Sequence, residues 1–322
     1  MTRARTQERR GSVRYTLVAA AFALTLAVAL GGGGYIYFVL MHYERVAARH
    51  VPASAEFAVR LDAEQLAVFD PIRRHVFPVV DQLLAGPGEE AGGLERVERA
   101  TKIELGRDAR EVVVASDESG SQWAVVVGGM FPRGEFVRGL SGVLAEYGFE
   151  LTADGRRLRG PRGLTVAQSA DGCIVVASST DWLEAALAGG GSELPRHHAL
   201  ALAATARALR HVGGPNLGPI DALRGTTELG TPLHVELELV TNRGDTPSDL
   251  AVVPQRLASW WGAPAPQRPS VTTDGPNRWV LHFDWDVGAL EAVARSWASE
   301  LRRRSGPSLP SGVDGSGGPK KP

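Results

Sequence analysis

The chain has 322 residues, a formal net charge of −1 at pH 7 and a single cysteine, Cys173. A charge so close to zero gives no general attraction to polyanions, so we predict no nucleic-acid partner. One cysteine excludes a disulfide within the chain, and its position far downstream excludes a lipid-modified N-terminal cysteine. Cys173 lies in a short apolar run, which predicts a buried and inert thiol.

Residues 15–41 form an apolar run without a charged side chain. At about 1.5 Å per residue, a helix over this run can cross a hydrocarbon core roughly 30 Å thick. Five arginines and one acid precede the run, a bias typical of the cytoplasmic flank of a span. We therefore predict a single transmembrane signal anchor, with residues 1–14 in the cytoplasm. A cleaved signal peptide is the alternative, although the run is longer than the usual apolar core of about 7–15 residues.

Small residues recur at every fourth position of the predicted span and therefore lie near one helix face: Ala19, Ala23, Ala27 and Gly31. Such a face lets a second helix approach closely in lipid, so a homodimer through the transmembrane helix is one hypothesis. The alternative is that abundant alanine produces the stripe by chance.

Arginine, alanine and glycine are plentiful and lysine is rare, a composition typical of a bacterium with GC-rich codons. In a bacterium, a single arginine-flanked anchor predicts a protein of the inner membrane. The C-terminal domain would then lie in the periplasm or elsewhere outside the cytoplasm.

The first half of the exported part alternates predicted strands and helices. Residues 55–62 have period two, with Phe57, Val59 and Leu61 on one face and Arg60 and Asp62 on the other, which predicts a half-buried strand. The other predicted elements are a helix over 66–84 interrupted at two prolines, a hairpin of 111–115 and 123–127, a helix over 133–147, hairpin turns at Asp154-Gly155 and Asp171-Gly172, and a helix over 180–187.

The second half is predicted to begin with an alanine-rich helix over 198–212. It continues with a strand over 233–240, a helix over 249–261, a hairpin of 270–272 and 279–286, and a helix over 287–304. Gly, Pro and Ser dominate residues 305–322, which favours disorder.

The elements together predict an α+β protein in which a single N-terminal transmembrane helix precedes an exported ectodomain. The ectodomain is predicted to contain two related split-βαβ-like units with antiparallel sheets. The expected segments are the N-terminus (1–14), the span (15–41), a juxtamembrane linker (42–54), the first unit (55–191), the second unit (192–304) and the tail (305–322).

Two predicted strands share the pattern apolar-His-apolar-acid-apolar-acid. Period two places the polar members of each strand on one face: His234, Glu236 and Glu238, and His282, Asp284 and Asp286. If the strands are neighbours, two imidazoles and four carboxylates converge in a ligand set suited to zinc or manganese. The alternative is that both sets are solvent faces of ordinary strands, and acids facing each other would then be destabilising.

No catalytic motif is evident, and the predicted cytoplasmic segment is too short for an output domain. These features favour a non-catalytic binding or scaffolding role in a cell-envelope assembly, with an envelope protein as partner and no cofactor. One alternative is a membrane-tethered metal-dependent hydrolase that uses His234 and His282 with nearby acids. Another is a sensory ectodomain that signals through a partner protein.

Overall fold

The computed structural model describes residues 44–299, apart from 76–77, 79–80, 82–91, 132–133, 191–193, 212–219, 231, 242–249, 262–263, 287, 289–290 and 297. The predicted span, its small-residue face at Ala19, Ala23, Ala27 and Gly31, and the predicted tail therefore lie outside the described residues. Within the described part, no helix has both the length and the apolar character that crossing a membrane requires.

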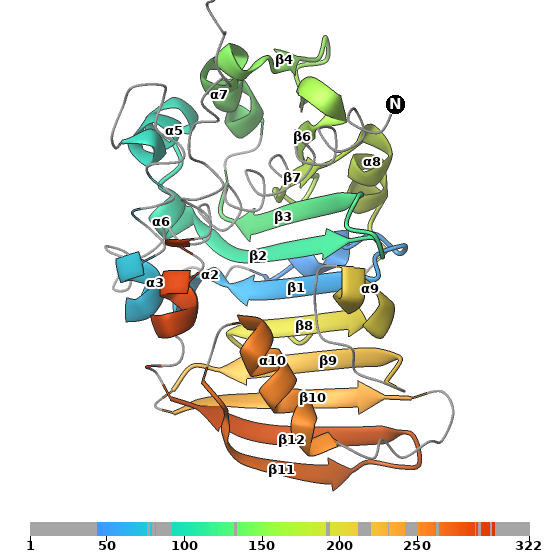
Figure 1. Cartoon of the computed structure of the whole chain (residues 1–322). Coiled ribbons are helices and arrows are strands. Elements are labelled where there is room, and N and C mark those ends of the chain that lie inside the picture. Colours follow the sequence, from blue (N-terminus) through green and yellow to red (C-terminus); the bar gives the residue numbers. More distant parts are fainter. Residues whose placement is uncertain are drawn as a thin grey trace, which may run out of the picture.

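The molecule is an α+β protein built on one large antiparallel sheet (Figure 1). Its strands are β1 (Phe57–Asp62), β2 (Ala109–Ser116), β3 (Trp123–Gly129), β4 (Glu150–Leu151), β5 (Arg157–Arg159), β6 (Thr165–Gln168), β7 (Ile174–Ala177), β8 (Leu200–Thr205), β9 (Ala222–Glu228), β10 (Leu233–Val240), β11 (Gln267–Thr273) and β12 (Arg278–Trp285). The 12 strands follow the order β11-β12-β10-β9-β8-β1-β2-β3-β7-β6-β5-β4.

The helices are short and lie on both sides of this sheet. They include η2 (Ala47–His50), α2 (Ala63–Ala67), α3 (Asp70–His75), α5 (Gly93–Thr101), α6 (Leu105–Asp108), α7 (Glu135–Leu144), η3 (Ala145–Tyr147), η4 (Pro161–Gly163), α8 (Thr180–Ala188), α9 (Ala206–His211), η5 (Leu250–Val252) and α10 (Val253–Trp261). Residues 291–296, within the predicted helix over 287–304, are also helical.

The strands of the two expected units belong to this one sheet. β1 is central, because it pairs with β2 on one side and with β8 on the other. Strands β2–β7 continue the sheet on the β2 side, and β9–β12 continue it on the β8 side. The two halves of the sequence therefore meet along the ladder between β1 and β8.

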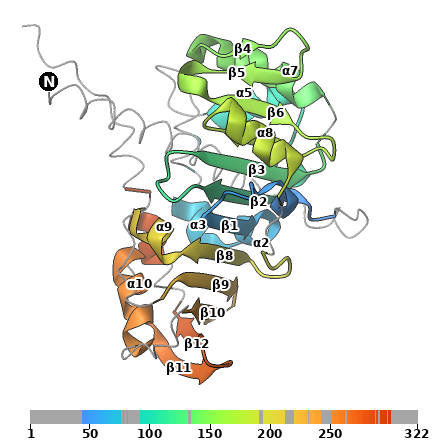
Figure 2. The ribbon, with the colours of Figure 1, turned by 90° about the vertical axis from the view of Figure 1, so that its right-hand side faces the viewer.

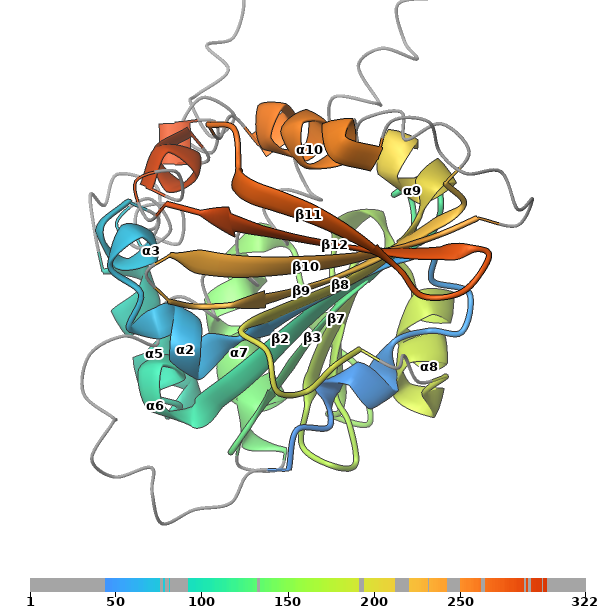
Figure 3. The same ribbon diagram turned by 90° about the horizontal axis from the view of Figure 1, so that it is seen from below.

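One face of the sheet is apolar from β12 to β6, and the outermost strands β11 and β4 are exposed. Helices α5 and α7 cover it over β2–β7, where Phe136 and Leu140 are fully buried. Helix α10 covers the same face over β9–β12, with Leu257 packed among Trp279, Leu281 and other apolar side chains. In Figure 3, α10 and α9 lie along one side of these strands.

The opposite face is covered in one half of the sheet only. Over β2, β3 and β7, it is packed under η2 and α8 by small and branched side chains such as Val113, Val126 and Val175. Figure 2 shows α8 across β3 and β6. Over β9, β10 and β12, the same face carries mostly exposed polar side chains. We call this second part the uncovered strand face: Arg224, Thr226, Glu228, His234, Glu236, Glu238, Arg278, His282 and Asp284.

The two outermost strands differ from the central ones. β11 is exposed throughout, and its pairing with β12 shifts register between Gln267 and Ser270, a stretch that contains Pro269. The neighbouring Arg268 has a φ of 49°, in the left-handed region. β4, at the other end, has only 2 residues.

The prediction of a helix over 198–212 is wrong in its first part. Residues Leu200–Thr205 form strand β8, and only Ala206–His211 are helical. Alanine favours helix in isolation, but pairing with both β1 and β9 outweighs this weak preference. Strand β9 was not predicted at all, since its sequence contains Gly225 and three polar residues in succession, Thr226, Thr227 and Glu228.

Most other elements agree with the sequence prediction. The hairpin of β2 and β3, the helix α7, and the turns at Asp154-Gly155 and Asp171-Gly172 are confirmed. The strand β10 and the hairpin of β11 and β12 are confirmed as well. The predicted interruption of the helix over 66–84 at Pro71 agrees with the structure, in which α2 ends at Ala67 and α3 begins at Asp70.

Candidate functional site

The two strands with the His-acid pattern, β10 and β12, are neighbours in the sheet. Their antiparallel register places His234 opposite Asp284 and Glu236 opposite His282, so histidines face acids rather than acids facing each other. His234 Nδ1 lies 2.7 Å from Asp284 Oδ1, and His282 Nδ1 lies 3.7 Å from Glu236 Oε2. This register removes the like-charge repulsion that a metal would otherwise have to relieve.

The remaining acids of the predicted ligand set have other partners. Glu238 forms an ion pair with Arg278, whose Nε lies 2.8 Å from Glu238 Oε1. Asp286 lies beyond the end of β12 and accepts a hydrogen bond from the backbone N–H of Gly288 at 2.7 Å. Four of the six side chains thus form two His-acid pairs, whereas Glu238 and Asp286 have partners outside the set, and a metal ion bound by the six stays a prediction.

Replacing His234 by alanine is expected to lower the free energy of unfolding by less than about 1 kcal/mol, because its side chain is 60% exposed and its contact with Asp284 is screened by solvent. The same small effect is expected for His282→Ala. Urea denaturation of each variant beside the unchanged protein measures it. A loss of several kcal/mol would show that these histidines are part of a buried or metal-bound structure.

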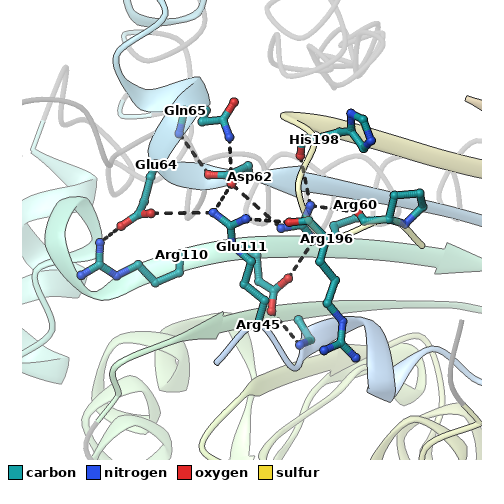
Figure 4. Close-up of polar contacts among 11 residues, drawn as sticks. Arg45, Arg60, Asp62, Glu64, Gln65, Arg110, Glu111, Arg196 and His198 are labelled. Carbon is teal, nitrogen blue, oxygen red and sulfur yellow. Dashed lines mark hydrogen bonds and ion pairs between the residues drawn. The ribbon is translucent and has the colours of Figure 1, made fainter. Parts of the chain in front are cut away.

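A second group of polar side chains lies buried at the centre of the sheet (Figure 4). The side chains of Arg60 and Asp62 on β1, and of Glu111 on β2, are 0% exposed. We call these three, together with the buried Arg110 and the partly exposed Arg45 and Glu64, the buried charge cluster. It contains three arginines and three acids, so its formal charge is zero.

Glu111 lies between a strand and the N-terminal segment. Its Oε2 accepts a hydrogen bond from Arg60 Nε at 2.9 Å, and its Oε1 accepts one from the backbone N–H of Ala47 at 2.8 Å. Arg60 also donates through Nη1 to the carbonyl oxygens of Pro195 and His198, at 3.3 and 3.1 Å. The pair therefore connects β1 and β2 to η2 and to the segment that precedes β8.

Asp62 connects the cluster to helix α2 and pairs with Arg45. It caps α2 by accepting a hydrogen bond from the backbone N–H of Gln65 at 3.1 Å, and Arg45 Nη2 lies 2.5 Å from its Oδ2. Arg45 in turn donates to the carbonyl oxygen of Arg196 at 2.6 Å, and Glu64 pairs with Arg110. A charge taken out of water needs partners of this kind to offset the cost of desolvation.

The sequence predicted a half-buried β1 with Arg60 and Asp62 on its polar face. That face is instead completely buried, because the segment that contains Arg45 and Ala47 and the segment of residues 195–198 lie over it. The prediction was wrong because period two separates the two faces of a strand without indicating which segments will cover them.

A third group connects η2 to the hairpin turn between β6 and β7. His50 Nε2 lies 2.9 Å from both carboxylate oxygens of Asp171, and His50 Nδ1 lies 2.9 Å from the carbonyl oxygen of Ala186. Asp171 also accepts a hydrogen bond from the Ser169 hydroxyl. One ligand atom each from His50, Asp171 and Cys173 lie within 4.8 Å of one another.

The Asp171 carboxyl remains ionised in this environment. Partial burial raises its pKa, but hydrogen bonds from Ser169 and His50, with the charge of His50, outweigh this effect and hold the pKa below its usual value. Its side chain is 35% exposed, so the group is open to solvent on one side. An ionised carboxylate next to an imidazole and a thiol is a donor set that metals use.

The sequence indicated none of this third group as a site. It assigned His50 to a linker, Asp171 to a turn and Cys173 to the inert core. Asp171 and Cys173 are near each other in the chain, but His50 precedes Asp171 by 121 positions. Only the folding of η2 onto the sheet brings His50 to that turn.

Comparison with known proteins identifies no family. No protein-family model matches the chain. The search of curated proteins likewise gave no match. Among solved structures, crystal forms I and III of TP0453 are similar, with 11% and 10% sequence identity and TM-scores of 0.46 and 0.47. The matches cover 81% and 79% of this chain and 98% and 99% of those chains.

Proposed function

We propose that the chain is a membrane-anchored extracytoplasmic protein that binds another protein of the cell envelope without catalysing a reaction. In this proposal residues 15–41 span the inner membrane, and the ectodomain consists of one unit over 55–191 and another over 192–304. Pairing of two copies through Ala19, Ala23, Ala27 and Gly31 belongs to the same proposal.

The uncovered strand face is the observation that supports a binding role. The opposite face of β9–β12 is packed under α10, whereas no helix of the described residues packs against this one. Side chains on it are mixed in charge, with four acids against two arginines when histidine is counted as neutral. A rigid sheet surface with an excess of acids favours a protein partner with a basic surface.

The hydrolase alternative has less support. His234 and His282 are each engaged with an acid on the open surface, in cross-strand pairs of the kind that stabilise ordinary sheets. A hydrolytic metal centre needs ligands that converge on one point and leave one position open for water.

Mild in-cell crosslinking followed by purification from membranes tests the proposed role. We expect a stoichiometric envelope protein to be recovered with the unchanged chain. It should be lost when Glu228 and Glu236, both exposed on the uncovered strand face, are replaced by lysine. Replacement of Glu95, an exposed acid on α5, by lysine is the matched control and should retain the partner.

Two outcomes would overturn the proposal. Recovery of the unchanged chain without another envelope protein would exclude the assembly role. Equal recovery of the partner by the Glu228→Lys, Glu236→Lys variant and by the Glu95→Lys control would exclude the uncovered strand face as the binding surface.

A further inference from the structure

We propose that His50, Asp171 and Cys173 form a zinc-binding site that joins the N-terminal segment of the ectodomain to the sheet. This site is distinct from the six residues on β10 and β12 and does not depend on the proposed binding role. It rests on the hydrogen bonds of His50, the chemistry of the three ligands and their position in the fold.

The two ring nitrogens of His50 both face acceptors. The carbonyl oxygen of Ala186 only accepts, so His50 Nδ1 carries the hydrogen and donates it at 2.9 Å. His50 Nε2 then faces both carboxylate oxygens of Asp171 at the same distance. A proton on Nε2 or a metal ion bound to it makes this contact favourable.

The surroundings match those of a metal-bound histidine. Such a histidine usually donates its other ring N–H to a backbone carbonyl or a carboxylate, which fixes the tautomer and the ring orientation. The Ala186 carbonyl does this for His50. Ligating carboxylates are also commonly held by a hydrogen bond, and the Ser169 hydroxyl supplies one to Asp171.

The ligand set selects zinc among common metals. Thiolate, imidazole and carboxylate together suit Zn²⁺, whereas Mg²⁺ and Ca²⁺ prefer oxygen ligands alone. Zinc bond lengths place tetrahedral ligand atoms roughly 3.3–3.8 Å apart. The ligand atoms here lie within 4.8 Å of one another, and His50 Nε2 lies 2.9 Å from Asp171, so His50 and Asp171 must move slightly apart to admit a zinc ion.

Access and charge are also compatible with zinc binding. Cys173 is 1% exposed and His50 is 7% exposed, whereas the side chain of Asp171 reaches solvent. The ion enters on the Asp171 side, where a water molecule can supply the fourth ligand. When zinc binds, the Cys173 thiol loses its proton to solvent, and two anionic ligands then balance the charge of Zn²⁺.

Titration of the untagged full-length chain in detergent with Co²⁺, under reducing conditions, tests the site. The chain has one cysteine, so a thiolate-to-cobalt charge-transfer band can come only from Cys173. We expect this band at one cobalt per chain, with displacement by Zn²⁺ and no displacement by Mg²⁺. Cys173→Ser should abolish it.

Asp171→Asn is the decisive variant, because Asp171 is partly exposed and the change preserves its shape, so the protein should fold. We expect metal affinity to fall by at least about 10- to 100-fold, and His50→Ala should give a similar or larger loss. The double variant His234→Ala, His282→Ala is the matched control and should bind as the unchanged protein does.

Thermal unfolding gives an independent readout. Zinc should raise the Tm of the unchanged protein and leave that of Cys173→Ser unaltered. Absence of the charge-transfer band in the unchanged chain would overturn the proposal. So would normal cobalt affinity in folded Asp171→Asn, or loss of binding only in the double histidine variant.

Discussion

Replacement of Glu111 by leucine is expected to lower the free energy of unfolding by about 3–5 kcal/mol, the largest effect of any single change considered for this protein. Leucine is similar in volume but accepts no hydrogen bond. The change would leave Arg60 with only the more distant Asp62, at 4.0 Å, as a carboxylate partner, and the N–H of Ala47 without its acceptor at 2.8 Å. An uncompensated buried charge is more costly than the absence of the whole pair.

Equilibrium denaturation in urea measures this effect. Two further variants show whether it comes from the unpaired buried charge. The double variant Arg60→Met, Glu111→Leu removes both charges and should recover a large part of the lost stability. Glu95→Ala breaks an exposed pair with Arg99 on α5 and should cost less than about 0.5 kcal/mol. If Glu111→Leu is as mild as Glu95→Ala, the buried charge cluster does not stabilise the centre of the sheet.

Substitution of Gly139 by alanine is expected to destabilise the protein by about 1–3 kcal/mol. Gly139 lies on α7 where that helix contacts the end of α5. A Cβ atom at this position would lie 2.3 Å from the carbonyl oxygen of Ala100 and 2.8 Å from the Cα of Thr101. Both are backbone atoms, so the two helices would have to separate.

Gly142, on the same helix, provides the matched control. A Cβ atom there would meet nothing within 4 Å. Gly142→Ala should therefore stabilise the protein by about 0.5–1 kcal/mol, since alanine loses less backbone entropy in a helix. Thermal or urea denaturation of both variants is the measurement. Equal stabilisation by the two substitutions would contradict the close packing of α5 against α7.

Sequence patterning predicted the elements whose signal is local. The alternation of apolar and polar residues predicted β10 and β12, and the Asp-Gly pairs predicted two hairpin turns. An amphipathic stripe predicted α7. β8 was missed because Leu200–Thr205 combines leucine with alanine, which is compatible with either helix or strand. Pairing with β1 and β9 decides in favour of the strand, and no local pattern shows that pairing.

For the candidate sites too, the sequence of one strand predicts which face a residue lies on but not its contacts with distant segments. The positions of His234 and His282 on one strand face followed from period two, but their cross-strand partners depend on the register of β10 with β12. The burial of Arg60 could not be predicted from its own strand, because the segments that cover it are far away in the chain. His50 and Asp171 likewise meet only after η2 has packed on the sheet.

The two ends of the sheet have a consequence for the solubility of the protein. An open sheet presents unpaired N–H and C=O groups at each outer strand, and these groups can template aggregation by strand addition. On β11, Pro269 removes one donor and the shifted register interrupts the straight ladder that an added strand would need. On the opposite edge, β4 is only 2 residues long and offers too little backbone for stable addition. Both edges therefore discourage chain-to-chain growth.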